Sequence, residues 1–287
     1  MGRTPIFLVI AILMTGCASK PRIVVGSKNF TEQVVLGEIV ARQIERRLNI
    51  DVDRKLDLGG TLLAHQALLG GSIDLYPEYT GTALTAVLKL PAAKDATRVL
   101  EKVRDGYRGW GIEWLDPLGF NDSFAMVIRS DIARSANLKS LSDAARQSAA
   151  WQLGVGYEFT QRPDGLDGLL KTYGLRLEGA PVTMDLGLLY PALQAKKITM
   201  AAANATDGML AHKEFMVLDD DRHYFPPYEC SVLVREDTLR QFSGLRSALT
   251  ELSGRITDAE MRRMNELVDV EHKPAADVAR DFLSKLK

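Results

Sequence analysis

The chain has 287 residues, of which 46% are hydrophobic and 25% are charged. These fractions are typical of folded, water-soluble proteins and exclude collagen-like, disordered and polytopic membrane chains. The 36 basic and 37 acidic residues nearly cancel, so binding to nucleic acid or to an anionic membrane surface has no electrostatic support, and a small-molecule partner is expected.

Targeting signals precede the folded part of the chain. Residues 6–14 form an apolar run after Arg3, and a run of this length is too short for a membrane-spanning helix, which needs about 20 residues. It predicts a signal peptide over residues 1–16. The segment Met14-Thr15-Gly16-Cys17 resembles the bacterial lipobox, after which Cys17 is lipidated; an ordinary cleavage site beside a chance cysteine is the alternative. Cys230 then has no disulfide partner and is expected to be a packed residue.

Strands and helices alternate along the first part of the mature chain. The β-branched run 23–26 leads into a helical pattern with apolar residues at every fourth position from Leu36 to Leu48. Asn29 and Glu32 have the spacing of a capping box and predict that this helix begins near Phe30. Further strands are expected at 52–58, 73–76 and 112–115, and helices at 62–69, from 80–82 onward and at 97–109. This alternation predicts parallel sheets covered by helices.

Two turn-rich stretches, 117–122 and 219–227, interrupt the pattern. Between them we expect strands or helices at 124–128, 151–157, 165–173, 188–196 and 200–203. A strand at 231–234 and a helical C-terminal part follow, with a second capping box at Thr257 and Glu260. The two stretches are predicted to be crossovers between two α/β lobes, one made of residues 17–121 and 229–287 and the other of residues 122–228. A ligand cleft is expected between the lobes.

No enzyme motif stands out. The four histidines lie outside zinc-binding contexts, and nucleophile-elbow and phosphate-loop patterns are missing. The acidic run 219–221 lacks the spacing of a calcium loop and is expected to be solvated. We therefore expect no metal, no cofactor and no catalysis.

Five segments in chain order resemble the periplasmic substrate-binding proteins of ABC importers for glycine betaine, choline, carnitine and other quaternary amines. They are GSKNFTEQ (26–33), DLYPEYTGT (74–82), LDPLGFN (115–121), ATDG (205–208) and FPPY (225–228). The resemblance implies an α/β fold of the type II periplasmic binding protein class, in which two α/β lobes joined by two crossovers close on a ligand in the cleft.

The resemblance also implies the site. A trimethylammonium group cannot donate a hydrogen bond, so aromatic faces, carboxylates or carbonyl dipoles must hold it. The family's four aromatic cage positions correspond here to Tyr79, Phe124, Asn204 and Tyr228, with the backbone carbonyl of Asp122 facing the ammonium. The family's carboxylate-binding positions correspond to Lys28, Thr82 and Arg162. Because Asn204 has no ring and Phe124 has no hydroxyl, weak binding of glycine betaine or a different ligand is expected. Tyr76, Tyr157 and Tyr190 are assigned to packing.

The expected protein is a monomeric lipoprotein, anchored to the membrane outside the cytoplasm, in the periplasm. It captures a quaternary ammonium osmoprotectant such as glycine betaine or choline and delivers it to an ABC permease with its ATPase. A binding protein of the same fold for another small polar solute and a ligand-sensing domain are the alternatives. Enzymes of similar architecture, the porphobilinogen deaminases, carry a covalent cofactor and work in the cytoplasm, which the signal sequence argues against.

Replacing the lipobox cysteine tests the anchor. We expect Cys17→Ser to release the protein from membranes, because the apolar run at 6–14 is too short to hold it there. Cells expressing each form are fractionated and washed with high salt. A serine variant that stays as membrane-bound as the wild type would show that the anchor lies elsewhere.

Overall fold

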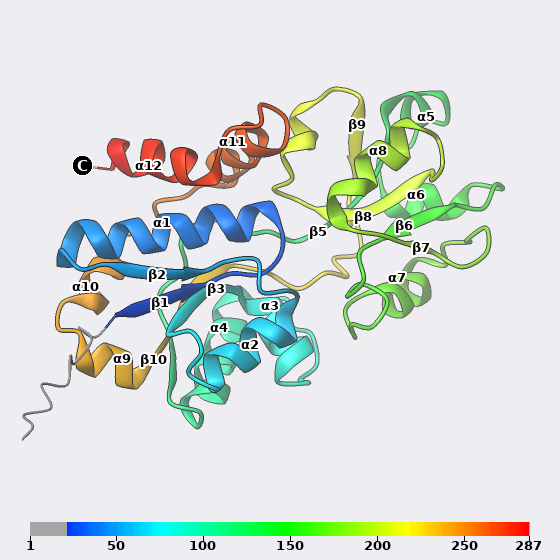
Figure 1. The fold of residues 1–287 in the computed structure, drawn as a ribbon. Coiled ribbons are helices and arrows are strands. Elements are labelled where there is room, and N and C mark those ends of the chain that lie inside the picture. The colour runs from blue at the N-terminus through cyan, green and yellow to red at the C-terminus, as the bar shows by residue number, and fades with distance from the viewer. Residues whose placement is uncertain (1–21, 287) are drawn as a thin grey trace, which may run out of the picture.

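The computed structural model describes residues 22–286. The expected signal peptide, residues 1–16, and the expected lipidation site, Cys17, lie outside the described residues. The described chain folds around two five-stranded sheets, ordered β2-β1-β3-β10-β4 and β7-β6-β8-β5-β9 (Figure 1). We call the parts built on the first and second sheet lobe 1 and lobe 2. Within residues 22–286, no helix has both the length and the apolar character needed to cross a membrane.

Lobe 1 combines strands from both ends of the chain. Its strands are β1 (Ile23–Gly26), β2 (Val52–Lys55), β3 (Leu75–Tyr79), β4 (Ile112–Trp114) and β10 (Cys230–Arg235). Its helices are α1 (Thr31–Leu48), α2 (Thr61–Leu69), α3 (Thr80–Thr82) with the π-helix η1 (Ala83–Val87), α4 (Ala96–Arg108), α9 (Glu236–Gln241), α10 (Leu245–Thr250), α11 (Asp258–Asp269) and α12 (Ala275–Lys285). Helix α1 packs on one face of the sheet, with α12 packed against α1, and helices α2 and α4 pack on the other face (Figure 1).

Lobe 2 is built from the middle of the chain. Its strands are β5 (Phe124–Arg129), β6 (Leu153–Val155), β7 (Val182–Thr183), β8 (Met200–Asn204) and β9 (Phe215–Leu218). Its helices are α5 (Ser130–Ser135), α6 (Leu141–Arg146), α7 (Leu166–Tyr173) and α8 (Leu189–Gln194), with short 3-10 turns η2 (Leu186–Leu188) and η3 (Gly208–Ala211). Alternate residues of β5 point to opposite faces: Ala125 and Val127 pack with α8, whereas Met126 and Ile128 belong to the core that includes α6 and α7.

Both sheets are mixed, so the prediction of parallel sheets was wrong in part. Strand β10 runs antiparallel to β3 and β4, and β5 runs antiparallel to β8 and β9. The crossovers explain the reversal. The second crossover returns the chain to lobe 1 where β3 ends, with Cys230 paired to Tyr79, so β10 must run back along β3. The prediction of two α/β lobes joined by two crossovers is confirmed.

Two capping boxes were predicted, and one is confirmed. Thr257 accepts the backbone N–H of Glu260 at the start of α11, and the Glu260 carboxylate accepts the backbone N–H of Thr257. The Asn29–Glu32 box was wrong. Helix α1 begins at Thr31 after Phe30 with no side-chain cap, because the Glu32 carboxylate is buried and hydrogen-bonded to other parts of the molecule.

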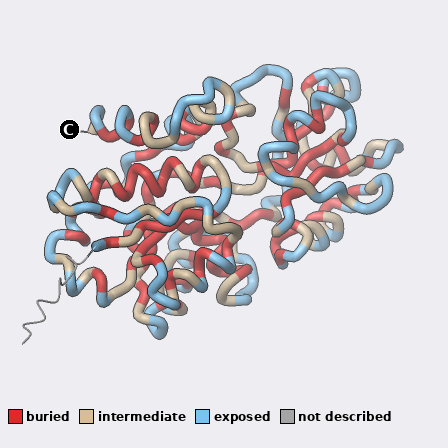
Figure 2. Tube along the Cα trace, viewed as in Figure 1, coloured by how far each residue is buried: buried red, intermediate tan, exposed pale blue. Residues whose placement is uncertain are grey.

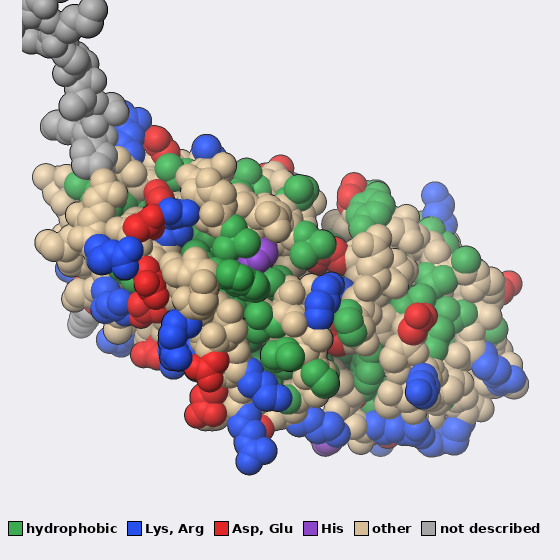
Figure 3. Space-filling model, turned by 90° about the horizontal axis from the view of Figure 1, so that it is seen from below, with side chains coloured by type: hydrophobic (Ala, Val, Ile, Leu, Met, Phe, Trp, Pro, Cys, Tyr) green, Lys and Arg blue, Asp and Glu red, His purple; other side chains and the backbone are tan. Residues whose placement is uncertain are grey.

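Burial is concentrated along the strands of both sheets and on the helix faces turned toward them (Figure 2). Cys230 is fully buried, as expected of a packed residue. In the second crossover Asp219 and Asp221 are exposed, as expected of a solvated loop, whereas Asp220 accepts hydrogen bonds from the backbone of Tyr224 and Phe225. On the face shown in Figure 3, basic and acidic side chains are interspersed over lobe 1.

Candidate ligand-binding site

A cavity of about 740 Å³ lies between the two lobes, within the range of about 300 to 1,000 Å³ that is usual for small-molecule sites. Its walls come from both lobes and from the first crossover. The structure brings all eight residues singled out from the sequence to this one cavity: Lys28, Tyr79, Thr82, Asp122, Phe124, Arg162, Asn204 and Tyr228.

Strand ends and the loops that follow them position these side chains. Lys28 lies in the loop after β1, and Tyr79 is the last residue of β3, directly before α3. In lobe 2, Phe124 begins β5 and Asn204 ends β8, and the two residues are directly paired in the antiparallel register. Because paired residues present their side chains to the same face of a sheet, Phe124 and Asn204 form one wall of the cavity.

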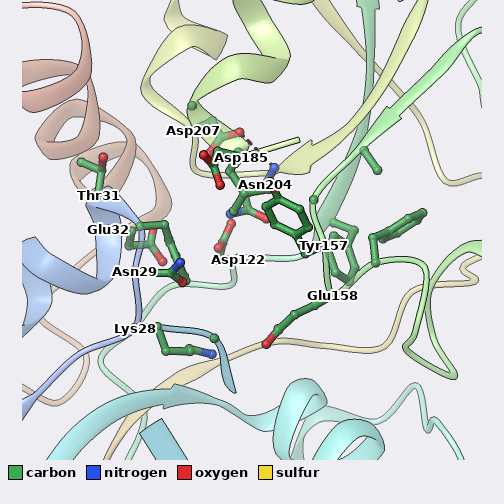
Figure 4. Close-up of a pocket in the computed structure, with 18 of the residues that line it drawn as sticks. Lys28, Asn29, Thr31, Glu32, Asp122, Tyr157, Glu158, Asp185, Asn204 and Asp207 are labelled. Atoms are coloured by element: carbon green, nitrogen blue, oxygen red, sulfur yellow. Dashed lines mark hydrogen bonds between the residues drawn. The ribbon is translucent and has the colours of Figure 1, made fainter. Parts of the chain in front are cut away.

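Several carboxyl groups lie in the interior of the site (Figure 4). Glu32 accepts hydrogen bonds from the hydroxyl of Tyr79 at 2.6 Å, from the amide of Asn265 at 3.1 Å and from the hydroxyl of Thr206. Burial raises the pKa of Glu32 above its usual value, although these bonds oppose the shift. Two of the donors, Tyr79 and Asn265, belong to lobe 1, and Thr206 lies in the loop after β8 of lobe 2, so one carboxyl group connects both lobes.

The Thr206 hydroxyl lies between two carboxyl groups. It is within hydrogen-bonding distance of Glu32 and, at 2.8 Å, of Asp122. A hydroxyl has one proton and can donate to only one of them, so the other carboxyl group must carry a proton to bond with it. Burial raises the pKa of Asp122 well above its usual value, and the charge of Glu32 raises it further. Burial raises the pKa of Glu32 as well, so the two coupled carboxyl groups hold one proton between them.

Asp207 is a third carboxyl group of the site and belongs to a half-buried residue. It accepts the backbone N–H of Asn204 at 3.0 Å and the hydroxyl of Tyr190 at 2.9 Å. Burial raises its pKa from 3.8 to about 7. Asp185 and Asp269 also line the cavity. A cavity with this many carboxyl groups favours a positively charged occupant, which would compensate their burial.

Two basic side chains line the described cavity, and each is already paired. The ammonium nitrogen of Lys28 lies 2.6 Å from Glu78 and 4.7 Å from the ring centroid of Tyr79. Lys28 is therefore neutralised within lobe 1 and covers an aromatic ring that was expected to face a ligand.

Arg162 is paired in the same way within lobe 2. It forms an ion pair with Asp164 at 2.6 Å and donates to the hydroxyl of Thr82 at 3.0 Å. Its guanidinium lies over the rings of Phe124 at 5.1 Å and Tyr228 at 5.5 Å. The predicted cage rings thus lie in two clusters, each of which already faces a cation of the chain itself.

Sequence reasoning missed several residues of the cavity. Tyr157, assigned to packing, is 60% exposed and lines the cavity. Tyr190 is packed as expected, yet it also lines the cavity and holds Asp207. Glu32 lies in the segment GSKNFTEQ and was interpreted as a helix cap. Asp207 lies in the segment ATDG and was assigned no role. Glu158 lies in no motif, and no sequence signal marks it.

Comparisons with known proteins agree with this geometry. Residues 21–285 match the family model described as the substrate binding domain of an ABC-type glycine betaine transport system. The glycine-betaine-binding protein of Pseudomonas aeruginosa is 32% identical over 282 residues, covering 95% of this chain and 90% of that protein.

A longer relative and a solved structure are also similar. The ergothioneine transport permease/ergothioneine binding protein of Helicobacter pylori is 30% identical over 98% of this chain, and the chain spans about half of its length, 51%. The crystal structure of a glycine betaine/carnitine/choline ABC transporter protein is 30% identical with a TM-score of 0.77, covering 92% of this chain and 98% of that one. The fold class expected from the sequence is thereby confirmed.

The raised pKa of Asp207 predicts a loss of stability as pH rises. Below its unfolded-state pKa of 3.8 the carboxyl is protonated in both states, and its contribution to stability is complete; that contribution is lost as pH rises through about 7. We expect the free energy of unfolding of the wild type to fall between about pH 4 and pH 7 by about 2 to 4 kcal/mol more than that of Asp207→Asn. Urea denaturation across this pH range measures both, and equal pH slopes would contradict the assignment.

Proposed function

The chain belongs to the family of substrate-binding domains of ABC-type glycine betaine transport systems, and from that premise we propose that it captures a quaternary ammonium solute such as glycine betaine or choline and delivers it to an ABC permease with its ATPase. The family consists of transport binding domains rather than enzymes. The names of the Pseudomonas aeruginosa relative and of the similar solved structure, which refer to glycine betaine, carnitine and choline, support this ligand class.

The observation that carries the proposal is the content of the cavity. It combines three carboxyl groups, the buried Glu32 and Asp122 and the half-buried Asp207, with aromatic rings. A quaternary ammonium ion offers charge without hydrogen-bond donors, so it is held by ring faces and by nearby negative charge. A ligand that needed many directed hydrogen bonds would find fewer free partners here, because most polar groups of the cavity already bond to one another.

We propose roles for the residues that line the cavity. Tyr79, Phe124 and Tyr228 supply aromatic faces, and Asn204 takes the fourth cage position. The backbone carbonyl of Asp122 faces the ammonium. Lys28, Thr82 and Arg162 hold the other end of the ligand. Tyr157 adds an aromatic surface, since its ring is exposed at the cavity.

We also propose where the protein lies and how its lobes are divided. Binding proteins of ABC importers work outside the cytoplasm, and a lipid on Cys17 would tether this one to the membrane in the periplasm; the lipobox-like segment supports that anchor. Residues 17–121 and 229–287 would form one lobe and residues 122–228 the other. The division of the strands between the two sheets supports this assignment.

Removing a cage ring tests the site. We expect Tyr79→Ala and Tyr228→Ala each to weaken binding of choline and glycine betaine by up to about thirtyfold, because a desolvated cation–π contact contributes up to about 2 kcal/mol. Calorimetry measures the affinities, and circular dichroism checks the fold. The matched controls Tyr79→Phe and Tyr228→Phe keep the rings and should retain most of the affinity. Unchanged affinity in both alanine variants would place the ligand elsewhere.

Replacing Asn204 by tyrosine tests whether this residue occupies the fourth position of the aromatic cage. In Asn204→Tyr the new ring would stand beside Phe124, its partner in the sheet register. We expect glycine betaine to bind about two- to thirtyfold more tightly than to the wild type, or about 0.5 to 2 kcal/mol. The assignment of Asn204 to the cage fails if the wild type already binds glycine betaine at low micromolar concentration, or if the variant binds every quaternary amine more weakly.

A further inference from the structure

Three features of the described cavity favour a negative charge, and each already holds a carboxylate of the chain. Lys28 is paired with Glu78 inside lobe 1, and Arg162 is paired with Asp164 inside lobe 2. The third feature is the N-terminus of the nine-residue helix α2, where free backbone N–H groups and the helix dipole attract anions. The carboxylate at this third position belongs to Glu158.

Glu158 differs from the other two carboxylates because it reaches across the cavity. It lies in the loop after β6 in lobe 2, and its oxygens accept the backbone N–H of Thr61 at 2.6 Å and the Thr61 hydroxyl at 3.0 Å. Thr61 is the first residue of α2 in lobe 1, and Gly60 before it provides no side-chain cap. Glu158 therefore caps a helix of the opposite lobe.

The approach of Glu158 depends on the absence of a side chain at Gly60. A Cβ atom at Gly60 would lie only 2.3 Å from a carboxylate oxygen of Glu158. The Thr61 hydroxyl that donates to Glu158 lies 3.4 Å from the ammonium of Lys28, so the carboxylate is placed beside a residue proposed to hold the far end of the ligand. Figure 4 shows Lys28 and Glu158 at one end of the cavity and Asp185, Asn204 and Asp207 at the other.

We propose that Glu158 is a specificity-determining residue: it takes the place that a ligand's carboxylate would occupy at the N-terminus of α2, so the site favours quaternary amines that lack a carboxylate over zwitterionic betaines. This inference rests on the proposed function and narrows its ligand class. A betaine carboxylate at this end would have to displace Glu158 or lie beside it, and juxtaposed like charges are strongly unfavourable. A neutral end, such as the hydroxyl of choline, meets no such repulsion. Glu158 hydrogen-bonds to Thr61 and so connects the two lobes. A ligand carboxylate at this position would otherwise make that connection.

The experiment compares choline with glycine betaine, which share the trimethylammonium group and differ in the carboxylate. Calorimetry measures the dissociation constants of both ligands for the wild type and for Glu158→Ala. We expect the wild type to bind choline at least about tenfold more tightly than glycine betaine, and the variant to shift this ratio toward glycine betaine by about tenfold or more. If Glu158→Ala does not fold, Glu158→Gln removes the charge at nearly constant size and should shift the ratio in the same direction.

Asp185→Ala is the matched control, because it removes another carboxylate from the cavity at the end away from Lys28 and Glu158. It should weaken both ligands alike and change their ratio by less than about threefold. Tighter binding of glycine betaine than of choline to the wild type, or a ratio that Glu158→Ala and Glu158→Gln leave unchanged, would overturn the inference while leaving the proposed function in place. If neither choline, glycine betaine nor carnitine binds the wild type, the proposed function fails and the inference falls with it.

Discussion

The hydrogen bonding of one threonine hydroxyl holds the site together. Thr206 lies between Glu32 of α1 and Asp122 of the first crossover, and Asn265 of α11 bonds both to Glu32 and to the Thr206 carbonyl. These contacts join lobe 1, including its helix α11, to lobe 2 and the first crossover at one buried point. Because the single hydroxyl proton cannot serve two carboxylates, the arrangement also fixes a proton inside the site. The same hydrogen bonds of Thr206 therefore connect the walls of the cavity and hold a proton between its carboxyl groups.

The basic side chains of the cavity are already paired, which explains why the cavity remains suited to a cation. The charges of Lys28 and Arg162 are compensated by Glu78 and Asp164, whereas Glu32, Asp122 and Asp207 face no basic partner among the described side chains in hydrogen-bonding contact with them. Desolvation then makes the ionised forms of these three groups unfavourable, and a bound cation relieves that cost. The aromatic rings add attraction without requiring a donor from the ligand. Selectivity for an ammonium group follows from the whole charge arrangement rather than from any single ring.

The sequence predicted the lobes, the crossovers and most elements, because apolar periodicity and turn residues report on local structure. It also placed eight residues that meet at one cavity. It failed where tertiary contacts decide. Glu32 has the spacing of a capping residue, yet its partners Tyr79 and Thr206 are distant in the sequence. The reversed direction of β10 depends on where the crossover returns. Glu158 and Tyr157 lie in an irregular loop, and Arg162 of the same segment packs on Phe124 and Tyr228, which are distant in the sequence, so no local pattern predicts their place in the site.

The most direct test of the account is a crystal structure of the mature protein grown with choline. We expect electron density for choline in the cavity between the lobes, with its quaternary nitrogen within about 6 Å of the centroid of at least one ring among Tyr79, Phe124 and Tyr228. The choline hydroxyl should point toward the end of the cavity that Lys28 and Thr82 line. Glu158 should remain on the N-terminus of α2. A cavity without choline, or a quaternary nitrogen that contacts none of these rings, would contradict the account.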